Sequence, residues 1–351
     1  MLIYHSVRTT TGFYNLSPFF RKLFLREKYL CLQKNHFRTY YNVLFFGSDS
    51  IALTCLEKVN ECRKNEGLVK RLDLVTANKT TTNIEKYAHM ENIQLLQWPE
   101  LNLKNGQYDI GLIASFGHLI KEDILEKFPL GIVNIHPSLL PRWRGAAPII
   151  YTLLHGDEIS GVSLMKIKPN IFDVGEIISQ KKVVISKDIK LPELTEQLSE
   201  IAAKMLVDCL RNLPTSLNNA KPQSNVGVTY AKKINKNISE VRWNEMGARD
   251  VYNLYRAIYG LYPLRTKFRD KQMKLFNAFL VESDSECNNK SIGSLEYCHE
   301  TKAIKILCKD KKHIYFKSLR IVGKREISAT DFYNGYIKRM LPDNNKELIN
   351  I

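Results

Sequence analysis

The most informative stretch of the chain is Gly131-Ile-Val-Asn-Ile-His-Pro-Ser-Leu-Leu-Pro-Arg-Trp-Arg-Gly-Ala-Ala-Pro148. It begins as an apolar strand that carries a carboxamide, Asn134, and an imidazole, His136, two residues apart. Alternate residues of a strand project from the same face, so both polar groups can enter one cleft. Prolines then end the strand, and a cationic loop follows. The pattern predicts a reactive site at a strand end; two hydrogen-bonded structural residues are the simpler alternative.

A second segment supplies an acid. Residues 161–167 alternate in the manner of a strand and lead into the turn-rich loop 168–176, which carries Asp173 two residues before Gly175. Alone, such an acid is typical of a surface turn. Together with Asn134 and His136 it would complete a triad of donor, base and carboxylate.

The chain from 42 to 135 alternates short apolar runs with amphipathic stretches. This rhythm predicts an α/β fold with a doubly wound, Rossmann-like parallel sheet. No GxGxxG sequence follows Gly47 at the end of the first strand, so no dinucleotide site is expected. A long amphipathic helix is predicted at 192–212, and the Pro-, Ser- and Asn-rich stretch 213–225 is expected to be a linker. A small C-terminal barrel is indicated by further strands at 264–268, 274–280, 303–308 and 313–321.

Charge is divided unevenly along the chain, which has a formal net charge of +16. Residues 1–41 are net +6, residues 42–224 are neutral, and residues 225–340 are net +11. A segment as basic as the last is expected to bind nucleic-acid phosphates. The seven cysteines are dispersed without a CxxC pair, so reduced thiols and no metal site are expected. No apolar run approaches the roughly 18 residues of a membrane span, so no membrane partner is expected.

Residues 1–41 form a basic leader. They contain seven Lys or Arg against one acid, with Phe19, Phe20, Leu23 and Phe24 interleaved. This composition is typical of a mitochondrial transit peptide and lacks the uninterrupted apolar core of a secretory signal. A disordered basic arm that binds RNA is the alternative.

The quoted motifs resemble one enzyme family. Asn-x-His at 134–136, the run from Ser138 to Pro148 and Asp-x-Gly at 173–175 are similar to the methionyl-tRNA formyltransferases, in particular the mitochondrial type. The resemblance covers most of residues 42–345, including Asn42-Val-Leu-Phe-Phe-Gly-Ser48. The wider family of formyl-folate transferases and hydrolases shares the Asn, His and Asp, but Arg-Trp-Arg favours the enzymes that act on tRNA.

The resemblance implies a domain map and a reaction. It implies a transit peptide at 1–41, a catalytic domain of the formyltransferase fold at 42–212, a linker at 213–225, and an OB-like, tRNA-binding β-barrel domain at 226–345. The implied reaction moves a formyl group from 10-formyltetrahydrofolate to the α-amine of initiator methionyl-tRNA. It would take place in the mitochondrial matrix, in a monomer and without a metal.

The resemblance also implies roles for individual side chains. Asn134 would donate to the formyl oxygen, and His136 would polarise that oxygen when protonated or accept the amine proton when neutral. Asp173 would orient His136 or relay a proton. His118 is a rival for proton transfer, although it lacks an Asn two residues before it. The implied folate contacts are Phe116, Gly117, Leu119, Ser138, Leu139, Leu140, Pro141 and Phe172.

The tRNA contacts are assigned to the cationic loop and the basic C-terminal segment. Arg142 and Arg144 could pair with phosphates, and Trp143 could stack on a base or pack below the loop. A structural role for either arginine is the alternative. Bacterial members of the family carry a longer basic insertion after the second strand, whereas residues 76–83 are short here and hold one lysine. The implied tRNA contacts are Arg142, Trp143, Arg144, Lys232, Lys233, Arg265 and Lys267.

Two other functions stay open at this point. A formyl-folate transferase or hydrolase acting on a small molecule would use the same triad, but the +11 charge of residues 225–340 opposes it. A catalytically silent RNA-binding relative would keep the basic segment, but intact Asn134, His136 and Asp173 oppose it.

The leader can be tested apart from the enzyme. Residues 1–41 fused to a passive reporter are expected to carry it into mitochondria, because basic and apolar residues are interleaved as in transit peptides. Fluorescence microscopy measures the location. Charge reversal at Arg8, Arg21, Lys22 and Arg26 is expected to leave the reporter in the cytosol, and unchanged import of that variant would refute the interpretation.

Overall fold

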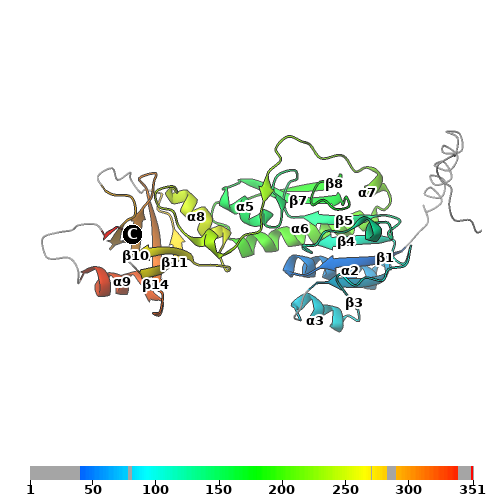
Figure 1. Cartoon of the computed structure of the whole chain (residues 1–351), viewed down its shortest axis with the longest axis horizontal. Coiled ribbons are helices and arrows are strands. Elements are labelled where there is room, and N and C mark those ends of the chain that lie inside the picture. The colour runs from blue at the N-terminus through cyan, green and yellow to red at the C-terminus, as the bar shows by residue number, and fades with distance from the viewer. Residues whose placement is uncertain (1–39, 78–80, 270, 283–289, 339–348, 351) are drawn as a thin grey trace, which may run out of the picture.

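The computed structural model describes residues 40–77, 81–269, 271–282, 290–338 and 349–350, the last pair by backbone only. They form two units that lie end to end in Figure 1, an α/β unit and a mainly β unit. The expected transit peptide lies outside the described residues except for Tyr40 and Tyr41. Tyr41 is already the first residue of strand β1 (Tyr41–Gly47).

The α/β unit is built on a seven-stranded sheet with the order β3-β2-β1-β4-β5-β7-β8. Strands β1 to β5 are parallel, as the sequence rhythm predicts. β7 is antiparallel to β5 and β8 is antiparallel to β7, so the sheet is mixed, and the predicted parallel arrangement holds for β1 to β5 but not at this edge. The remaining strands are β2 (Val69–Thr76), β3 (Gln94–Gln97), β4 (Ile110–Ala114), β5 (Ile132–His136), β7 (Ile159–Lys166) and β8 (Ile177–Val184).

The connection from β5 to β7 explains the change of direction. Its helix, α5 (Pro148–Leu154), has seven residues and is therefore about 10 Å long. A parallel strand needs a crossover that carries the chain back along the full sheet. The short helix does not do so, and β7 re-enters the sheet at the end where β5 left it, with Ser163 opposite His136.

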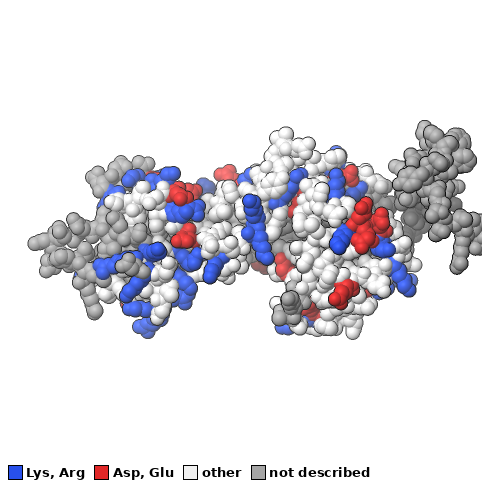
Figure 2. Space-filling model, in the orientation of Figure 1, with Lys and Arg blue, Asp and Glu red and all other residues white. Residues whose placement is uncertain are grey.

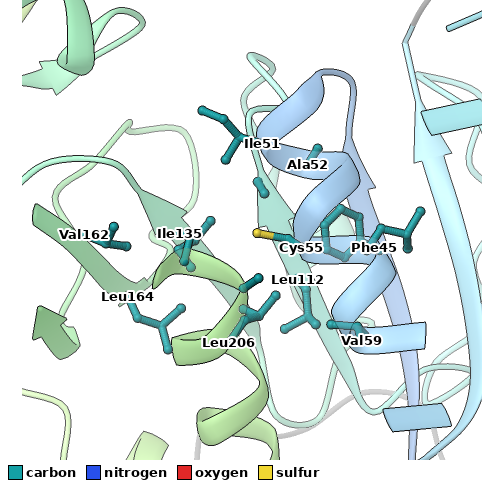
Figure 3. Packing of buried hydrophobic residues seen from close by; sticks show 14 of the residues in the cluster. Phe45, Ile51, Ala52, Cys55, Val59, Leu112, Ile135, Val162, Leu164 and Leu206 are labelled. Atoms are coloured by element: carbon teal, nitrogen blue, oxygen red, sulfur yellow. The ribbon is translucent and has the colours of Figure 1, made fainter. Parts of the chain in front are cut away.

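The two faces of this sheet are covered differently, by helices on one face and mainly by loops on the other. On one face α2 (Ser50–Asn65) packs against α6 (Leu191–Arg211), and Figure 3 shows Cys55 and Leu206 from these helices lying against Leu112 of β4. On the other face a second apolar cluster closes over the sheet. Each fully buried apolar side chain contributes about 1.5–3 kcal/mol, so the strand ends are held rigidly. The smaller helices of this unit are α3 (Asn83–Met90), α4 (Glu122–Leu125) and α7 (Thr215–Asn218).

The C-terminal unit is an antiparallel sheet with the order β10-β11-β14-β13-β12-β16, and β15 pairs with β14. Within the described strands, no pairing joins β10 at one edge to β12 or β16 at the other, so a closed barrel is not found. The strands are β10 (Leu264–Phe268), β11 (Lys271–Phe279), β12 (Ser294–Cys298), β13 (Ala303–Leu307), β14 (His313–Ile321), β15 (Ile327–Ser328) and β16 (Ile349–Asn350). Helices α8 (Ala248–Ala257) and α9 (Ala329–Phe332), a 3-10 helix (Lys236–Ser239) and a π-helix (Tyr333–Ile337) complete the unit.

A buried arginine joins the two units where α8 packs on α5. Arg256 is 3% exposed, and its guanidinium donates to the carbonyl oxygens of Leu153 and Ser186 at 3.2 and 3.3 Å. Burial lowers the pKa of Arg256. Because Leu153 lies in the last turn of α5, the cation also meets the negative end of that helix dipole.

The stretch 213–225, expected to be a linker, is attached to the α/β unit. It contains α7, and Lys221 exchanges backbone hydrogen bonds of 2.8 and 2.7 Å with Ile177 of β8. Further on, β9 (Tyr230–Ala231) pairs with β6 (Arg144–Gly145) in the cationic loop. The chain between the two units therefore runs along the edge where β5 ends.

The fit between β7, β8 and the loop after β5 can be tested at Gly161. A Cβ there would lie 2.0 Å from the Lys181 carbonyl oxygen and 2.8 Å from a Leu139 methyl carbon. Gly161→Ala is expected to lower the free energy of unfolding by about 1–3 kcal/mol, measured by urea denaturation. Gly335→Ala is the control, because no heavy atom lies within 4 Å of its Cβ position. Equal stability of both variants would contradict the close packing.

Candidate active site

β5 ends in the two polar residues that the sequence singles out. Asn134 is half-buried and His136 is 4% exposed, between core residues of the same strand. His136 Nε2 lies 2.9 Å from the carbonyl oxygen of Trp143. A carbonyl oxygen can only accept, so Nε2 carries a proton. In the neutral ring the lone pair is therefore on Nδ1, the nitrogen on the other side of the ring.

Asp173 lies in the loop between β7 and β8, in an unusual backbone conformation. Its φ is 55°, in the left-handed region, and the residue is 9% exposed. Two residues later, Gly175 lies so close to β7 that a Cβ would be 1.6 Å from the Lys166 carbonyl oxygen. The loop is therefore pressed against the strand, and the Asp173 carboxylate turns back toward the end of β5.

The structure brings the three predicted catalytic residues together. Asp173 Oδ1 lies 3.4 Å from Asn134 Nδ2 and 3.5 Å from His136 Nδ1. The other oxygen, Oδ2, accepts a 2.8 Å hydrogen bond from the backbone N–H of Gly145. The arrangement places an amide donor, an imidazole and a carboxylate around one point at the carboxyl edge of the sheet.

The loop after β5 is held from inside by two serines. Ser138 is 1% exposed, and its hydroxyl donates to the Arg142 carbonyl oxygen at 2.6 Å. Ser163 of β7 donates to the Ser138 carbonyl oxygen at 2.6 Å and accepts from the Leu140 N–H at 3.0 Å. The Ser138 hydroxyl, predicted to contact folate, is thus engaged within the loop.

Arg142 and Trp143 are tied to one carboxylate that was not predicted from the sequence. Arg142 donates from Nε and Nη2 to the two oxygens of Asp157 at 2.8 and 2.6 Å. Trp143 is 5% exposed and donates from Nε1 to the same carboxylate at 2.8 Å. These hydrogen bonds raise the pKa of Arg142, so the ion pair is maintained. Trp143 packs below the loop, which was the alternative to stacking on a base.

Arg144 is held by a second residue that no sequence pattern marks. Its Nη2 and Nε donate to Gln223 Oε1 at 2.7 and 3.2 Å. Gln223 Nε2 in turn donates to the carbonyl oxygens of Asp173 and Gly175 at 3.0 and 2.8 Å. Gln223 lies in the polar stretch 213–225, where composition alone predicts only a linker.

Loop 168–173, which carries Asp173, meets a second loop that is distant in sequence. The N–H of Asn170 donates to the Ile120 carbonyl oxygen at 3.3 Å, which joins loop 168–173 to loop 115–120. Leu119 and Phe172 are 39% and 50% exposed. The other predicted folate contacts range from exposed Gly117, through half-buried Leu139 and Pro141, to buried Phe116, Ser138 and Leu140.

The predicted tRNA contacts outside the loop differ in their exposure and in their hydrogen bonds. Lys232, Lys233 and Lys267 are exposed. Arg265 donates to Ser239 Oγ at 2.8 Å and to the Lys236 carbonyl oxygen at 3.0 Å. Arg265 also lies opposite Lys274 on β11, which lies opposite Arg320 on β14. Arg320 was not predicted, because its place in this row depends on strand register.

Metal sites, disulfides and membrane spans each place their own requirements on the described residues. Within the described ranges no group of three or more His, Cys, Asp or Glu side chains could hold a metal ion. The described cysteines are free. None of the described helices combines the length and apolar character that crossing a bilayer requires.

Comparisons with known proteins identify the family of the chain. The family model described as "Formyl transferase" matches residues 63–210, and "Formyl transferase, C-terminal domain" matches residues 233–337. The mitochondrial methionyl-tRNA formyltransferase of Bos taurus is 39% identical over 308 residues, which cover 85% of this chain and 78% of that protein. The methionyl-tRNA formyltransferase of Caldicellulosiruptor saccharolyticus is 29% identical, over 84% of this chain and 97% of that protein.

Solved structures share the fold. The N-formyltransferase from Helicobacter canadensis, in complex with folinic acid and dTDP-3-aminofucose, has a TM-score of 0.60 and 19% identity, covering 78% of this chain and 98% of that one. At this identity the likeness supports the fold alone. The identity to the bovine protein extends over most of both chains and confirms the predicted family. This chain belongs to the methionyl-tRNA formyltransferases.

Proposed function

We propose that this protein transfers a formyl group from 10-formyltetrahydrofolate to the α-amine of methionyl-tRNA, which supplies formylmethionyl-tRNA for translation initiation in mitochondria. The observation that carries the proposal is the convergence of Asn134, His136 Nδ1 and Asp173 Oδ1 within 3.5 Å. The Bos taurus and Caldicellulosiruptor saccharolyticus relatives carry the same activity in their names, and the bovine relative is named as mitochondrial.

Asn134 is suited to the formyl oxygen. The amine nitrogen forms a bond to the formyl carbon, charge develops on the formyl oxygen, and the bond to N10 of the folate then breaks. One amide hydrogen of Asn134 is directed at Asp173, which leaves the second for that oxygen. A donor already in place stabilises the developing charge without reorganisation.

His136 and Asp173 are suited to moving the proton. The amine loses one proton and the leaving N10 gains one, so the reaction needs an acceptor that can return it. Neutral His136 offers the lone pair of Nδ1, because Nε2 carries the hydrogen and donates it to the Trp143 carbonyl oxygen. Asp173 Oδ1, 3.5 Å away, stabilises the imidazolium that results.

The exposed apolar side chains of loops 115–120 and 168–173 are proposed to hold the folate. Leu119, Ile171 and Phe172 expose large apolar surfaces beside the triad, and a pterin ring would cover them. Backbone groups at Gly117 and nearby can read the ring edge. Of the remaining predicted contacts, half-buried Leu139 and Pro141 would border the bound folate, whereas buried Phe116, Ser138 and Leu140 would support the loops from below.

The tRNA is proposed to lie across the basic face of the C-terminal unit. Figure 2 shows Lys and Arg side chains gathered over this unit, whereas acidic residues are prominent on the α/β unit. Lys232, Lys233 and Lys267 would contact phosphates directly, and Arg265 together with Lys274 and Arg320 would extend the row. Arg142 and Trp143 are proposed to shape the loop, and Arg144 to contact the acceptor end.

We propose an OB-like curl for the C-terminal sheet. On β14 the buried positions change from Ile314 and Phe316 to Leu319 and Ile321, so the strand turns over midway. The facing residue on β11, Asn277, has a φ of 53°. Bends of this kind curl a sheet toward a barrel.

The domain map belongs to the same proposal. It keeps a transit peptide at 1–41, a catalytic domain at 42–212, a linker at 213–225 and a tRNA-binding domain at 226–345. The protein is proposed to act as a monomer in the mitochondrial matrix.

A formylation assay tests the function. The purified protein is incubated with 10-formyltetrahydrofolate and either methionyl-tRNA, an amino-sugar nucleotide or glycinamide ribonucleotide. Formylation of methionyl-tRNA alone is expected, since the C-terminal basic face serves no purpose for a small substrate. Formylation of a small amine instead would assign the protein to another formyl-folate transferase activity.

Substitutions at the triad are expected to remove catalysis and to leave tRNA binding. Asn134→Ala and His136→Ala should each lower kcat by about 100-fold or more, because each removes a group that acts on the transition state. Asp173→Asn should cause a comparable loss. His118→Ala tests the rival imidazole, whose exposed ring packs against Trp98 and Phe116, and it is expected to lower kcat much less than His136→Ala. Single-turnover kinetics measures the rates, and near-normal turnover of His136→Ala would sink the assignment.

Charge reversal on the C-terminal unit separates binding from chemistry. A Lys232→Glu, Lys233→Glu, Lys267→Glu variant is expected to bind tRNA at least about 10-fold more weakly, and its affinity should depend less steeply on salt because fewer phosphates are neutralised. Its kcat at saturating tRNA should stay near normal. Lys86→Glu with Lys204→Glu, on exposed helix faces of the α/β unit, is the control for added negative charge. Equal affinities of the two variants in filter binding would refute the proposed surface.

A further inference from the structure

Gln223 occupies a position that connects the cationic loop to the catalytic acid. Its amide oxygen accepts from Arg144 Nη2 at 2.7 Å and Nε at 3.2 Å. Its amide nitrogen donates to Asp173 O at 3.0 Å and Gly175 O at 2.8 Å. The oxygen and the nitrogen of this carboxamide are therefore both hydrogen-bonded, and they connect two loops that are distant in the sequence.

The chemistry of these contacts requires a carboxamide of this length. Two carbonyl oxygens need donors and a guanidinium needs an acceptor, and one amide supplies all of them. A glutamate would accept from Arg144 but would turn a bare oxygen toward the two carbonyls. The backbone beside Gln223 is fixed as well, because Lys221 pairs with Ile177 of β8.

The hydrogen bonds close a ring around Asp173. The Gly145 N–H holds the Asp173 carboxylate at 2.8 Å, and Gln223 holds the backbone carbonyl of the same residue. Arg144, the neighbour of Gly145, completes the ring through Gln223. The left-handed φ of 55° is costly for an aspartate and persists only where the surroundings impose it.

The geometry points to Gln223 as a positioning residue that fixes Asp173 against His136 and Asn134, with Arg144 fixing Gln223 in turn. The kinetic part of this inference rests on the proposed formyl transfer, because Asp173 is taken as part of its catalytic triad. Gln223 touches neither reacting group. Its effect is expected in kcat, since a displacement of about 1 Å in a catalytic constellation can cost on the order of 100-fold.

The test compares Gln223→Ala, Gln223→Met and Gln223→Glu in the full enzyme. Each is expected to lower kcat for methionyl-tRNA by about 10- to 100-fold, with KM for tRNA changed less than about threefold. Gln223→Met keeps the length and packing, so it reports on the hydrogen bonds if the alanine variant is unstable. Gln197→Ala, at an exposed position on α6, is the matched control. A kcat within about twofold of wild type for Gln223→Met would overturn the positioning role.

The Arg144 link has its own test in a double-mutant cycle. If Arg144 acts on kcat through Gln223, the kcat of Arg144→Ala with Gln223→Ala should be no lower than that of Gln223→Ala alone. Multiplied losses would show that the two residues act independently, and would overturn the link.

A crystal structure of Gln223→Met gives a readout that does not depend on activity. Asp173 is expected to leave the left-handed region or to move its carboxylate by about 1 Å or more from His136. An unchanged Asp173 would overturn the inference even if the wild-type protein formylated nothing. Inactive wild-type protein with a displaced Asp173 in the variant would instead refute only the proposed function.

Discussion

The active site depends on the hydrogen bonds that the carboxylate of Asp157 accepts. This carboxylate receives hydrogen bonds from both the Arg142 guanidinium and the Trp143 indole, and the Asp157 side chain is 11% exposed. These bonds hold Trp143 at a φ of 62°, and the same residue presents its carbonyl oxygen to His136 Nε2. The carbonyl in turn selects the protonated nitrogen of the imidazole. An ion pair without any role in chemistry thus determines which nitrogen faces the triad.

Backbone conformations that are costly for ordinary residues recur around this point. Asp173 and Trp143 both have positive φ, and a Cβ on Gly145 would lie 2.6 Å from the Ala231 carbonyl oxygen. Each left-handed non-glycine residue costs on the order of 1–3 kcal/mol, which the surrounding hydrogen bonds must offset. The site can hold them because it lies at the edge of a rigid sheet whose core is filled on both faces. These backbone conformations direct the Asp173 carboxylate and the Trp143 carbonyl oxygen toward His136.

The sequence predicts the parts of this molecule that follow from local periodicity. The strand at 132–136 and its alternation are sufficient to place Asn134 and His136 on one face, whereas the addition of Asp173 depended on the resemblance to the formyltransferase family. Asp157 and Gln223 could not be foreseen, because one of two adjacent acids after a helix and one of several amides in a polar stretch have no distinguishing pattern. The antiparallel direction of β7 was missed for a related reason: strand patterns carry no direction, and only the length of α5 limits the crossover. The sequence shows that Arg142 is charged but does not show its ion pair with Asp157. Arg142 was therefore predicted to contact tRNA.

Helix α5 links the chemistry to the charge of the other unit. Asp157 lies three residues after the end of α5, and Arg256 of the C-terminal unit donates to Leu153 in the last turn of the same helix. The catalytic loop and the basic sheet are therefore anchored to neighbouring points on one short, buried element. Residues 42–224 are neutral while residues 225–340 are net +11, so phosphate attraction acts almost wholly on the C-terminal unit. The proposed tRNA-binding surface is thus linked to the triad through Arg256 and α5, which would let a catalytic unit of zero net charge act on a substrate held by the basic unit.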